Sequence, residues 1–179
     1  STMRRIDEII VIGSGNWGLA LASVFCANRP TRVWTFNAEL ATHLNAHRDN
    51  PGEFYPFAIP ESITVEEKFA SPFDSAATLV ILAVPSGQVA NAAAELGEHA
   101  ANPLVMTVSK GYDAGRLCTM SALVKAEVPG ADVIVLSGPT IANEVAAGKP
   151  TRAVLAGEHL MVLARVREAL VNDVLSFEE

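Results

Sequence analysis

One stretch near the start of the chain, EIIVIGSGNWG, constrains the fold more than any other. A run of branched apolar residues, typical of a buried strand, stops at Gly13, and Gly15 and Gly18 follow directly. Apolar residues then resume at helical spacing. In a strand–turn–helix unit the first glycine allows a tight turn, the second lets a pyrophosphate approach the backbone, and the third permits close helix–strand packing. The pattern favours a dinucleotide-binding turn over a tight turn without a ligand.

Short apolar runs alternate with longer amphipathic segments along the rest of the chain. Because each predicted strand is apolar along its length, we expect a mostly parallel sheet covered by helices on both faces. Right-handed crossovers then give a doubly wound α/β sheet, a Rossmann-type domain that takes up residues 1–179. Strands are expected at residues 8–13, 32–36, 78–84, 103–109, 132–137 and 152–157. Helices are expected after the glycines and at residues 38–47, 86–100, 117–128 and 160–171.

Composition narrows the class of partner. Half of the 179 residues are hydrophobic, so the chain can bury a sizeable core. The formal net charge of -7 argues against a nucleic-acid partner or an anionic membrane surface. The longest apolar run is too short for membrane insertion. Ser1 and Thr2, ahead of Met3, are expected to be a non-native remnant and are set aside.

The two cysteines do not make a disulfide framework. Cys26 and Cys118 fall in segments that are predicted as different helices, and Cys118 is expected to be a small core residue. No signal peptide is apparent at the start of the chain. We therefore expect a reducing, cytoplasmic environment.

The end of the second predicted strand bears on the choice of cofactor. A side chain there usually handles the adenosine ribose, about twenty residues after the glycines. This chain has Thr35, Phe36 and Asn37, with Glu39 slightly later, and thus no clean aspartate and no basic residue for a 2′-phosphate. Phe36 either lies against an adenine or is a partly buried aromatic. The absence of a basic residue favours NAD over NADP, and NADP stays open.

Several strand ends, taken together, carry a resemblance to a known family. The chain resembles the amino-terminal domain of NAD(P)-dependent glycerol-3-phosphate dehydrogenases, from Ile9 to about Phe177. The motifs, in order, are GSGNWGLALA at 13–22, VILAVPS at 80–86, SKG at 109–111 and LSGPTIANEVAAGKPT at 136–151. The last two distinguish this family from other dinucleotide-binding proteins better than the first, which is generic.

The resemblance implies an oxidoreductase that transfers a hydride between NAD(P)H and dihydroxyacetone phosphate or sn-glycerol 3-phosphate, in phospholipid precursor synthesis. It also implies that a helical second domain, beyond Glu179, carries the principal catalytic lysine and the arginine that holds the substrate phosphate. The 179-residue chain alone is then expected to be inactive. An apolar face left bare by the second domain would favour a homo-oligomer.

Site residues carried over from the family follow the matched motifs. Lys110 is implied to touch both cofactor and substrate, where its ammonium would stabilise the alkoxide that hydride transfer develops. Its plain alternative is an exposed lysine before a turn glycine. Gly138 and Thr140 are implied for substrate, although GPT alone is also a turn and Thr140 a helix cap. The implied cofactor-binding residues are Gly13, Gly15, Asn16, Trp17, Gly18, Phe36, Pro85, Ser86, Lys110 and Ala142.

Other features weigh against different chemistry. His43 and His47 are spaced i, i+4, but no glutamate lies between them and no cysteine or third histidine is near in sequence, so a solvated helix face is expected and no metal site. Ser86 lacks the glycines of a nucleophile elbow. Residues 64–68 are expected to be a solvated stretch, and the proline-rich loop 49–62 departs from the family at Phe57.

Two alternatives share the glycine pattern. A related two-domain keto-acid reductase would have the fingerprint but should lack the GPTIANEVAAG motif. A non-enzymatic NAD(H)-sensing module would have the sheet but no need of Lys110 and Thr140 in one cleft.

Overall fold

The structure is a computed structural model that describes residues 4–49, 58–108, 112–113, 118–138 and 147–178. Its main element is an eight-stranded sheet with the strand order β10-β9-β8-β5-β4-β1-β2-β3. Neighbouring strands are parallel except for β8 and β9, which are antiparallel. The strands are β1 (Glu8–Ile12), β2 (Thr31–Thr35), β3 (Thr64–Glu67), β4 (Thr78–Leu82), β5 (Leu104–Thr107), β8 (Asp132–Ser137), β9 (Thr151–Gly157) and β10 (Leu175–Glu178).

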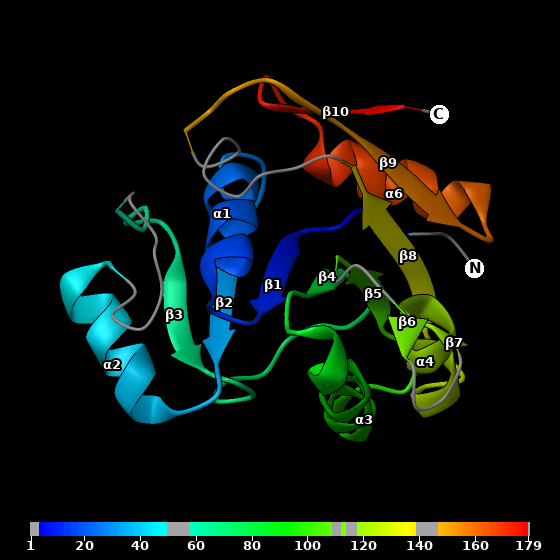
Figure 1. The fold of residues 1–179 in the computed structure, drawn as a ribbon, viewed down its shortest axis with the longest axis horizontal. Helices are drawn as coiled ribbons and strands as arrows, with labels where there is room; N and C mark the ends of the chain where they lie inside the picture. Colours follow the sequence, from blue (N-terminus) through cyan, green and yellow to red (C-terminus); the bar gives the residue numbers. More distant parts are fainter. Residues whose placement is uncertain (1–3, 50–57, 109–111, 114–117, 139–146, 179) are drawn as a thin grey trace.

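Helices cover both faces of this sheet, and a two-stranded ribbon lies outside it (Figure 1). The ribbon pairs β6 (Tyr112–Asp113) with β7 (Cys118–Thr119). The helices are α1 (Asn16–Phe25), α2 (Ala38–His47), the 3₁₀ turn η1 (Ser86–Gln88), α3 (Val89–His99), α4 (Met120–Glu127) and α6 (Leu160–Leu170). The predicted doubly wound, mostly parallel α/β sheet is confirmed.

The strands are apolar on both faces because each face packs against its own helices. Alternate residues of the central strands enter two separate cores, as the two-residue period of a strand requires. One core lies on the side of α1, α2 and α6, and the residues that β1, β4 and β5 contribute to it are Ile9, Val11, Leu79, Ile81, Leu104 and Met106. The other lies on the side of α3 and α4, and the same three strands contribute Ile10, Ile12, Val80, Leu82 and Val105 to it.

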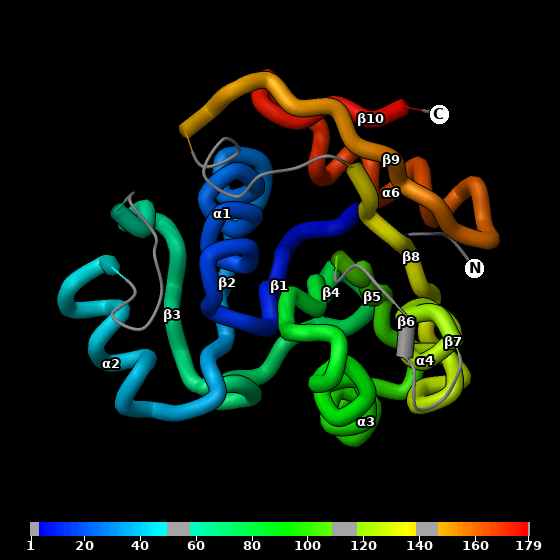
Figure 2. Tube along the Cα trace, viewed as in Figure 1, coloured from blue at the N-terminus to red at the C-terminus, as the bar shows by residue number. Residues whose placement is uncertain are grey.

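The chain changes direction at the centre of the sheet. From β1 it runs outward through β2 to β3 at one edge, then returns to β4 on the other side of β1 and continues toward β10 (Figure 2). The crossovers therefore diverge beyond the carboxyl ends of β1 and β4. In open α/β sheets such a switch point leaves a crevice where ligands bind.

Two strands at the sheet edges were not expected from the sequence. Residues 64–68, predicted as a solvated stretch, contain β3, which pairs with β2 and buries Val65. β10 pairs with β9 beyond the last predicted helix. Both strands have only four residues and carry exposed charged or polar side chains, as edge strands do, so their local patterns are weak.

The prediction of a helix over residues 117–128 is wrong at its start. Cys118 lies in β7, and α4 begins only at Met120. The Thr119 hydroxyl accepts a hydrogen bond from the Ala122 amide at 3.3 Å and so caps the helix there. Cys118 still packs, partly buried, against the core beside α3 and α4.

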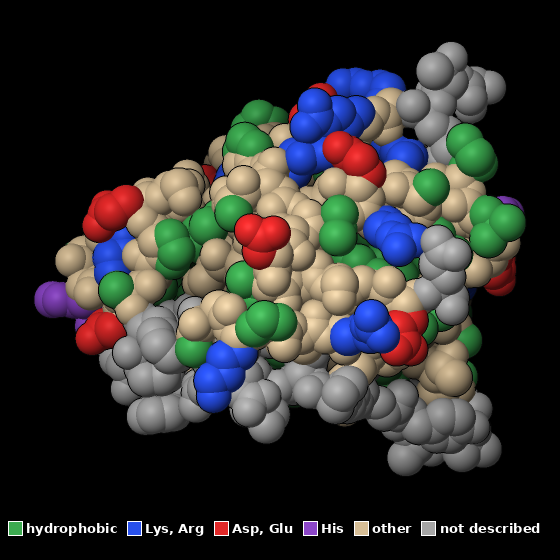
Figure 3. Space-filling model, turned by 90° about the horizontal axis from the view of Figure 1, so that it is seen from above, with side chains coloured by type: hydrophobic (Ala, Val, Ile, Leu, Met, Phe, Trp, Pro, Cys, Tyr) green, Lys and Arg blue, Asp and Glu red, His purple; other side chains and the backbone are tan. Residues whose placement is uncertain are grey.

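The described surface combines charges of both signs. On the face seen in Figure 3, Lys and Arg side chains lie next to Asp and Glu. Among the described residues, no helix is long and apolar enough to cross a bilayer.

Candidate functional site

A pocket of about 770 Å³, here called the main pocket, opens beyond the carboxyl ends of five strands. It lies at the switch point between β1 and β4, where the fold leaves room for a ligand. Its lining residues follow β1, β2, β4 and β5 or end β8. They are Gly13, Ser14, Gly15, Asn16, Trp17, Phe36, Ala83, Val84, Pro85, Ser86, Gln88, Val108, Leu136, Ser137 and Gly138.

The glycine turn, residues 13–18, joins β1 to α1 in a space with no room for side chains at two of its glycines. Gly13 has φ +120°, and a Cβ there would collide with the Ala83 carbonyl oxygen. A Cβ on Gly18 would collide with the Gly13 carbonyl oxygen. Both glycines are thus required by the close approach of β1, α1 and the end of β4, as the first and third positions of the fingerprint predict.

Gly15 differs from the other two glycines. It is the N-cap of α1 with φ −70° and ψ 179°, a conformation open to any residue. It makes no side-chain cap, and α1 carries no acidic residue in its first turn. The positive dipole end of α1 therefore lies at the main pocket, and the first turn of the helix carries no carboxylate that would compete for an anion there. This arrangement suits an anion.

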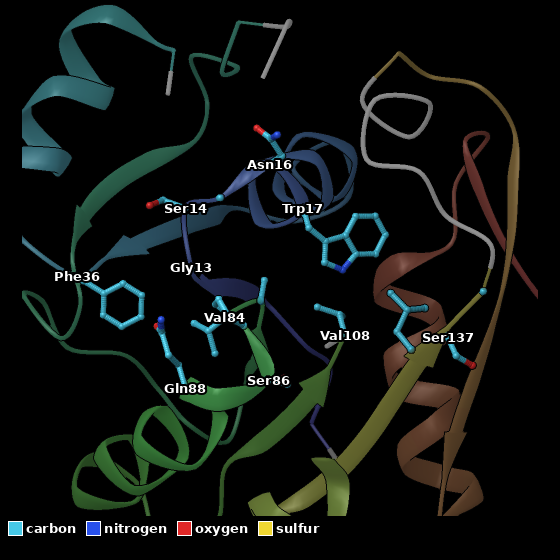
Figure 4. Close-up of a pocket in the computed structure, with 15 residues that line it drawn as sticks. Gly13, Ser14, Asn16, Trp17, Phe36, Val84, Ser86, Gln88, Val108 and Ser137 are labelled. Atoms are coloured by element: carbon cyan, nitrogen blue, oxygen red, sulfur yellow. The ribbon is translucent and has the colours of Figure 1, made fainter. Parts of the chain in front are cut away.

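Two side chains at the start of α1 add to this end of the pocket. The Asn16 Oδ1 atom is buried without a hydrogen-bond partner among the described residues. The Trp17 indole extends across the pocket toward the side where Val108 and Ser137 lie (Figure 4). The residues implied at 13, 15, 16 and 17 therefore line one cavity.

The wall opposite the glycine turn follows β4. Pro85 and Ser86 are exposed residues that line the main pocket at the start of η1. At one end of the pocket the Gln88 side chain faces the Phe36 ring (Figure 4). Phe36 is 42% exposed, so it is a rim residue rather than part of the core.

A smaller cavity, the side pocket, continues beyond Phe36 and Gln88, which line both cavities. Its volume is about 260 Å³. Lys68 lies here, directly after β3, and its ammonium sits 5.1 Å from the centre of the Phe36 ring. The side pocket is lined by Ile12, Phe36, Lys68, Phe69, Gln88, Asn91, Ala92 and Glu95.

Lys68 corrects one sequence expectation. The sequence has no basic residue at the end of β2, but the pairing of β2 with β3 brings Lys68 beside Phe36. The Lys68 amide donates to the carbonyl of Thr35, the last residue of β2, at 2.9 Å, so the pairing continues one residue past the end of β3. Residues 64–68 alone do not predict this contact, because it depends on the pairing of β3 with β2.

The other polar groups at the end of β2 serve the backbone. The Thr35 hydroxyl donates to the Asn37 carbonyl at 2.8 Å. The Asn37 side chain accepts from the Leu40 amide at 2.7 Å and caps α2. The Thr35 hydroxyl proton and the Asn37 Oδ1 atom are therefore both engaged by the backbone.

An ionic network supports the β2–β3 edge from the side of α3. Burial alone would raise the pKa of Glu66, but hydrogen bonds from Ser71, Trp34 and Arg32 outweigh it and hold that pKa below its usual range. Burial would lower the pKa of Arg32, and the carboxylates of Glu8 and Glu66 raise it instead. The network fixes the edge strands that carry Phe36 and Lys68.

Several predicted site residues lie outside the described residues. They are Lys110, Thr140 and Ala142, together with Tyr55 and Phe57 of the loop. Gly138 is described and lines the main pocket at the end of β8. A Cβ on Gly138 would lie 3.2 Å from the Ala153 Cα atom, so β9 packs tightly against this position.

The histidine pair lies on α2, near one carboxylate among the described residues. The His43 and His47 rings lie 4.5 Å apart on α2, and His43 Nε2 is 3.0 Å from Asp49 Oδ1. Within the part of the chain that the structure describes, no group of three or more His, Cys, Asp or Glu side chains could hold a metal ion.

Comparison with known proteins agrees with this geometry. Residues 8–162 match the family model for the NAD-dependent glycerol-3-phosphate dehydrogenase N-terminus. The glycerol-3-phosphate dehydrogenase [NAD(P)+] of Thiobacillus denitrificans is 34% identical over 169 residues, which cover 94% of this chain and 51% of that protein.

Solved structures show the same fold. A glycerol-3-phosphate dehydrogenase from Coxiella burnetii matches 96% of this chain and 53% of its own with a TM-score of 0.80 at 22% identity. The Plasmodium falciparum enzyme gives a TM-score of 0.81 at 21% identity, over 96% of this chain and 52% of its own. The chain spans about half the length of the curated relatives it matches. This chain belongs to the family of NAD-dependent glycerol-3-phosphate dehydrogenase N-terminal domains.

Proposed function

We propose that the chain is the cofactor-binding domain of a glycerol-3-phosphate dehydrogenase and binds NAD(P)H in the main pocket. The observation that carries this proposal is the open N-terminus of α1, with Gly15 as an uncapped N-cap facing the cavity. Its amides would hold the pyrophosphate, because they are hydrogen-bond donors at the positive end of a helix dipole. The bound cofactor supplies the hydride.

Different residues of the main pocket would contact different parts of the cofactor. Phe36 would lie against the adenosine end, while Pro85 and Ser86 would border the path toward the nicotinamide. Gly138, at the end of β8, would border the substrate. Asn16 and Trp17 complete the wall at the start of α1.

The reaction of the whole protein would be hydride transfer between NAD(P)H and dihydroxyacetone phosphate, giving sn-glycerol 3-phosphate for phospholipid synthesis. Lys110 would place its ammonium against the developing alkoxide, Thr140 would contact the substrate, and Ala142 would touch the cofactor. We place this work in the cytoplasm, which accords with the free thiols of Cys26 and Cys118. The chain alone should show no turnover, because the relatives devote half of their length to further residues.

The test is calorimetric titration of the chain with NADH and NADPH, compared with a Gly15→Asp variant. An aspartate at this N-cap would accept hydrogen bonds from the first amides of α1 and repel a pyrophosphate, so we expect cofactor affinity to fall at least about tenfold. The unfolding free energy should stay the same or rise by about 1 kcal/mol, since aspartate is a favourable N-cap.

Ser176→Asp is the charge control. It introduces the same charge at an exposed residue of β10 that lines neither cavity, and it should leave cofactor affinity within about twofold. A folded wild-type chain that binds neither cofactor, or a Gly15→Asp variant that binds as well as wild type, contradicts the proposal.

A further inference from the structure

The side pocket ends in a single ion pair. The Lys68 ammonium lies 2.8 Å from Glu95 Oε2, and the pair links the end of β3 to α3 across the cavity. Both side chains are partly buried, with exposed fractions of 27% and 33%. The ammonium also lies over the face of the Phe36 ring, which attracts a cation. Lys68 therefore has two partners already.

The position of Lys68 is fixed by its neighbours. Its amide is bound to Thr35, and the following residue, Phe69, has φ +59°, in the left-handed region that bulky residues rarely adopt. The Phe69 ring is held between Trp34, 4.7 Å away, and His99, stacked at 4.0 Å. This packing holds the turn after β3 in place, so the ion pair is a built feature of the pocket.

The charges around the two pockets are few. Among the described residues, Lys68 is the only cation that lines either cavity, and Glu95 is the only carboxylate. A dinucleotide whose pyrophosphate lies at Gly15 would reach past Phe36 with its adenosine ribose, the part that carries the 2′-phosphate in NADP. That phosphate would meet an ammonium already neutralised by Glu95.

We propose that the Lys68–Glu95 pair sets the cofactor preference of this domain, favouring NAD because Glu95 occupies the cation that a 2′-phosphate would need. The inference rests on the cofactor binding proposed above and adds a residue pair that acts on specificity. NADPH binding requires the Lys68 ammonium to leave Glu95, and it brings the 2′-phosphate close to the Glu95 carboxylate. The uncharged 2′-hydroxyl of NADH can bind without breaking the ion pair.

The test measures the ratio of NADPH to NADH affinity by calorimetry in four variants of the chain. Glu95→Gln frees the ammonium for a charge-assisted bond to phosphate, and the ratio should rise about tenfold. Lys68→Met keeps the apolar stem and leaves Glu95 unpaired, so the ratio should fall about threefold. In the double variant the ratio should return to within about twofold of wild type, because neither charge remains.

Glu98→Gln is the control for the charge change alone. Glu98 lies one turn from the pair on α3, is exposed, and lines neither pocket, so its loss should leave the ratio unchanged within about twofold. The gain in Glu95→Gln should also shrink as salt is raised, since it is electrostatic.

Two failures are distinguishable. If wild type binds NADH and Glu95→Gln gains no NADPH affinity, or gains no more than Glu98→Gln, the specificity inference is wrong while the proposed function stands. If wild type binds neither cofactor, the proposed function itself is wrong. Unfolding midpoints of all variants show that each chain is folded in the titrations.

Discussion

The two ends of the cavity system are built in different ways. At the glycine turn the backbone sets the shape: Gly13 and Gly18 approach carbonyl groups too closely for a side chain, and the N-terminus of α1 borders the pocket. At the far end the walls are side chains, with Phe36 after β2 and Lys68 after β3. The first end is formed by six consecutive residues, 13–18. The second end is formed by residues from three separate segments, after β2, after β3 and in α3.

The difference shows which end of the cavity system can accept substitutions. Gly13 and Gly18 tolerate almost no added atoms, because their neighbours are backbone carbonyl groups that cannot move away. A side-chain end can change its charge by one substitution without disturbing the sheet. The two proposals above divide along the same line: dinucleotide binding is assigned to the glycine turn, and discrimination between dinucleotides to the Phe36 end.

The largest effect should come from adding one methyl group at the glycine turn. Gly13→Ala places a Cβ against the Ala83 carbonyl oxygen and forces alanine to φ +120°. We expect the unfolding free energy to fall by about 3 kcal/mol, measured by urea denaturation. Gly87→Ala adds the same methyl group in open space and should change stability by less than about 0.5 kcal/mol. Equal effects at the two positions would refute the backbone argument.

A smaller effect is expected at the edge that carries the far end of the site. Glu66 accepts hydrogen bonds from Trp34 Nε1 at 2.8 Å and from Ser71 Oγ at 2.6 Å. Glu66→Gln should lower the unfolding free energy at pH 7 by about 1.5 kcal/mol, because bonds to a charged acceptor are replaced by weaker ones. The exposed neighbour Glu67, changed to Gln, should cost less than about 0.5 kcal/mol.

The stability difference between wild type and Glu66→Gln should also depend on pH. The folded pKa of Glu66 is below its ordinary value of 4.5, so its contribution is fully present above pH 4.5 and is lost as the pH falls through the folded pKa. The stability gap between wild type and Glu66→Gln should therefore narrow in acid. A gap that stays constant down to pH 2 would show that the ionised form of Glu66 is not what stabilises this edge.

The smallest effect on stability, and a clear one on binding, is expected at Phe36. Because the ring is 42% exposed, Phe36→Ala should change the unfolding free energy by less than about 0.5 kcal/mol. NADH affinity should fall about fivefold in calorimetry, since an adenine would lose a stacking surface worth about 1 kcal/mol. Val171→Ala, at a similarly exposed apolar residue after α6, controls for surface truncation and should leave affinity unchanged. An equal loss in both variants would contradict a role for the ring.

Much of the fold could be predicted because its signals are local. The apolar runs of β1, β4 and β5 are buried on both faces, so hydrophobicity alone marks them. The edge strands β3 and β10 were not predicted, because their stability comes from pairing with a neighbouring strand rather than from their own residues. The antiparallel direction of β9 likewise depends on how the chain returns to β8, which the residues of β9 do not specify.

The sequence by itself determined the glycine turn, the doubly wound sheet and the family, because each depends on residues that are close along the chain or on motifs in a constant order. Only the tertiary structure decided that Lys68 lies against Phe36 and pairs with Glu95. Phe36 directly follows β2 and Lys68 directly follows β3, so the register of these two strands brings them together, and the packing of α3 adds Glu95. Long-range pairing of this kind is a property of the packed sheet, and no short stretch of residues encodes it.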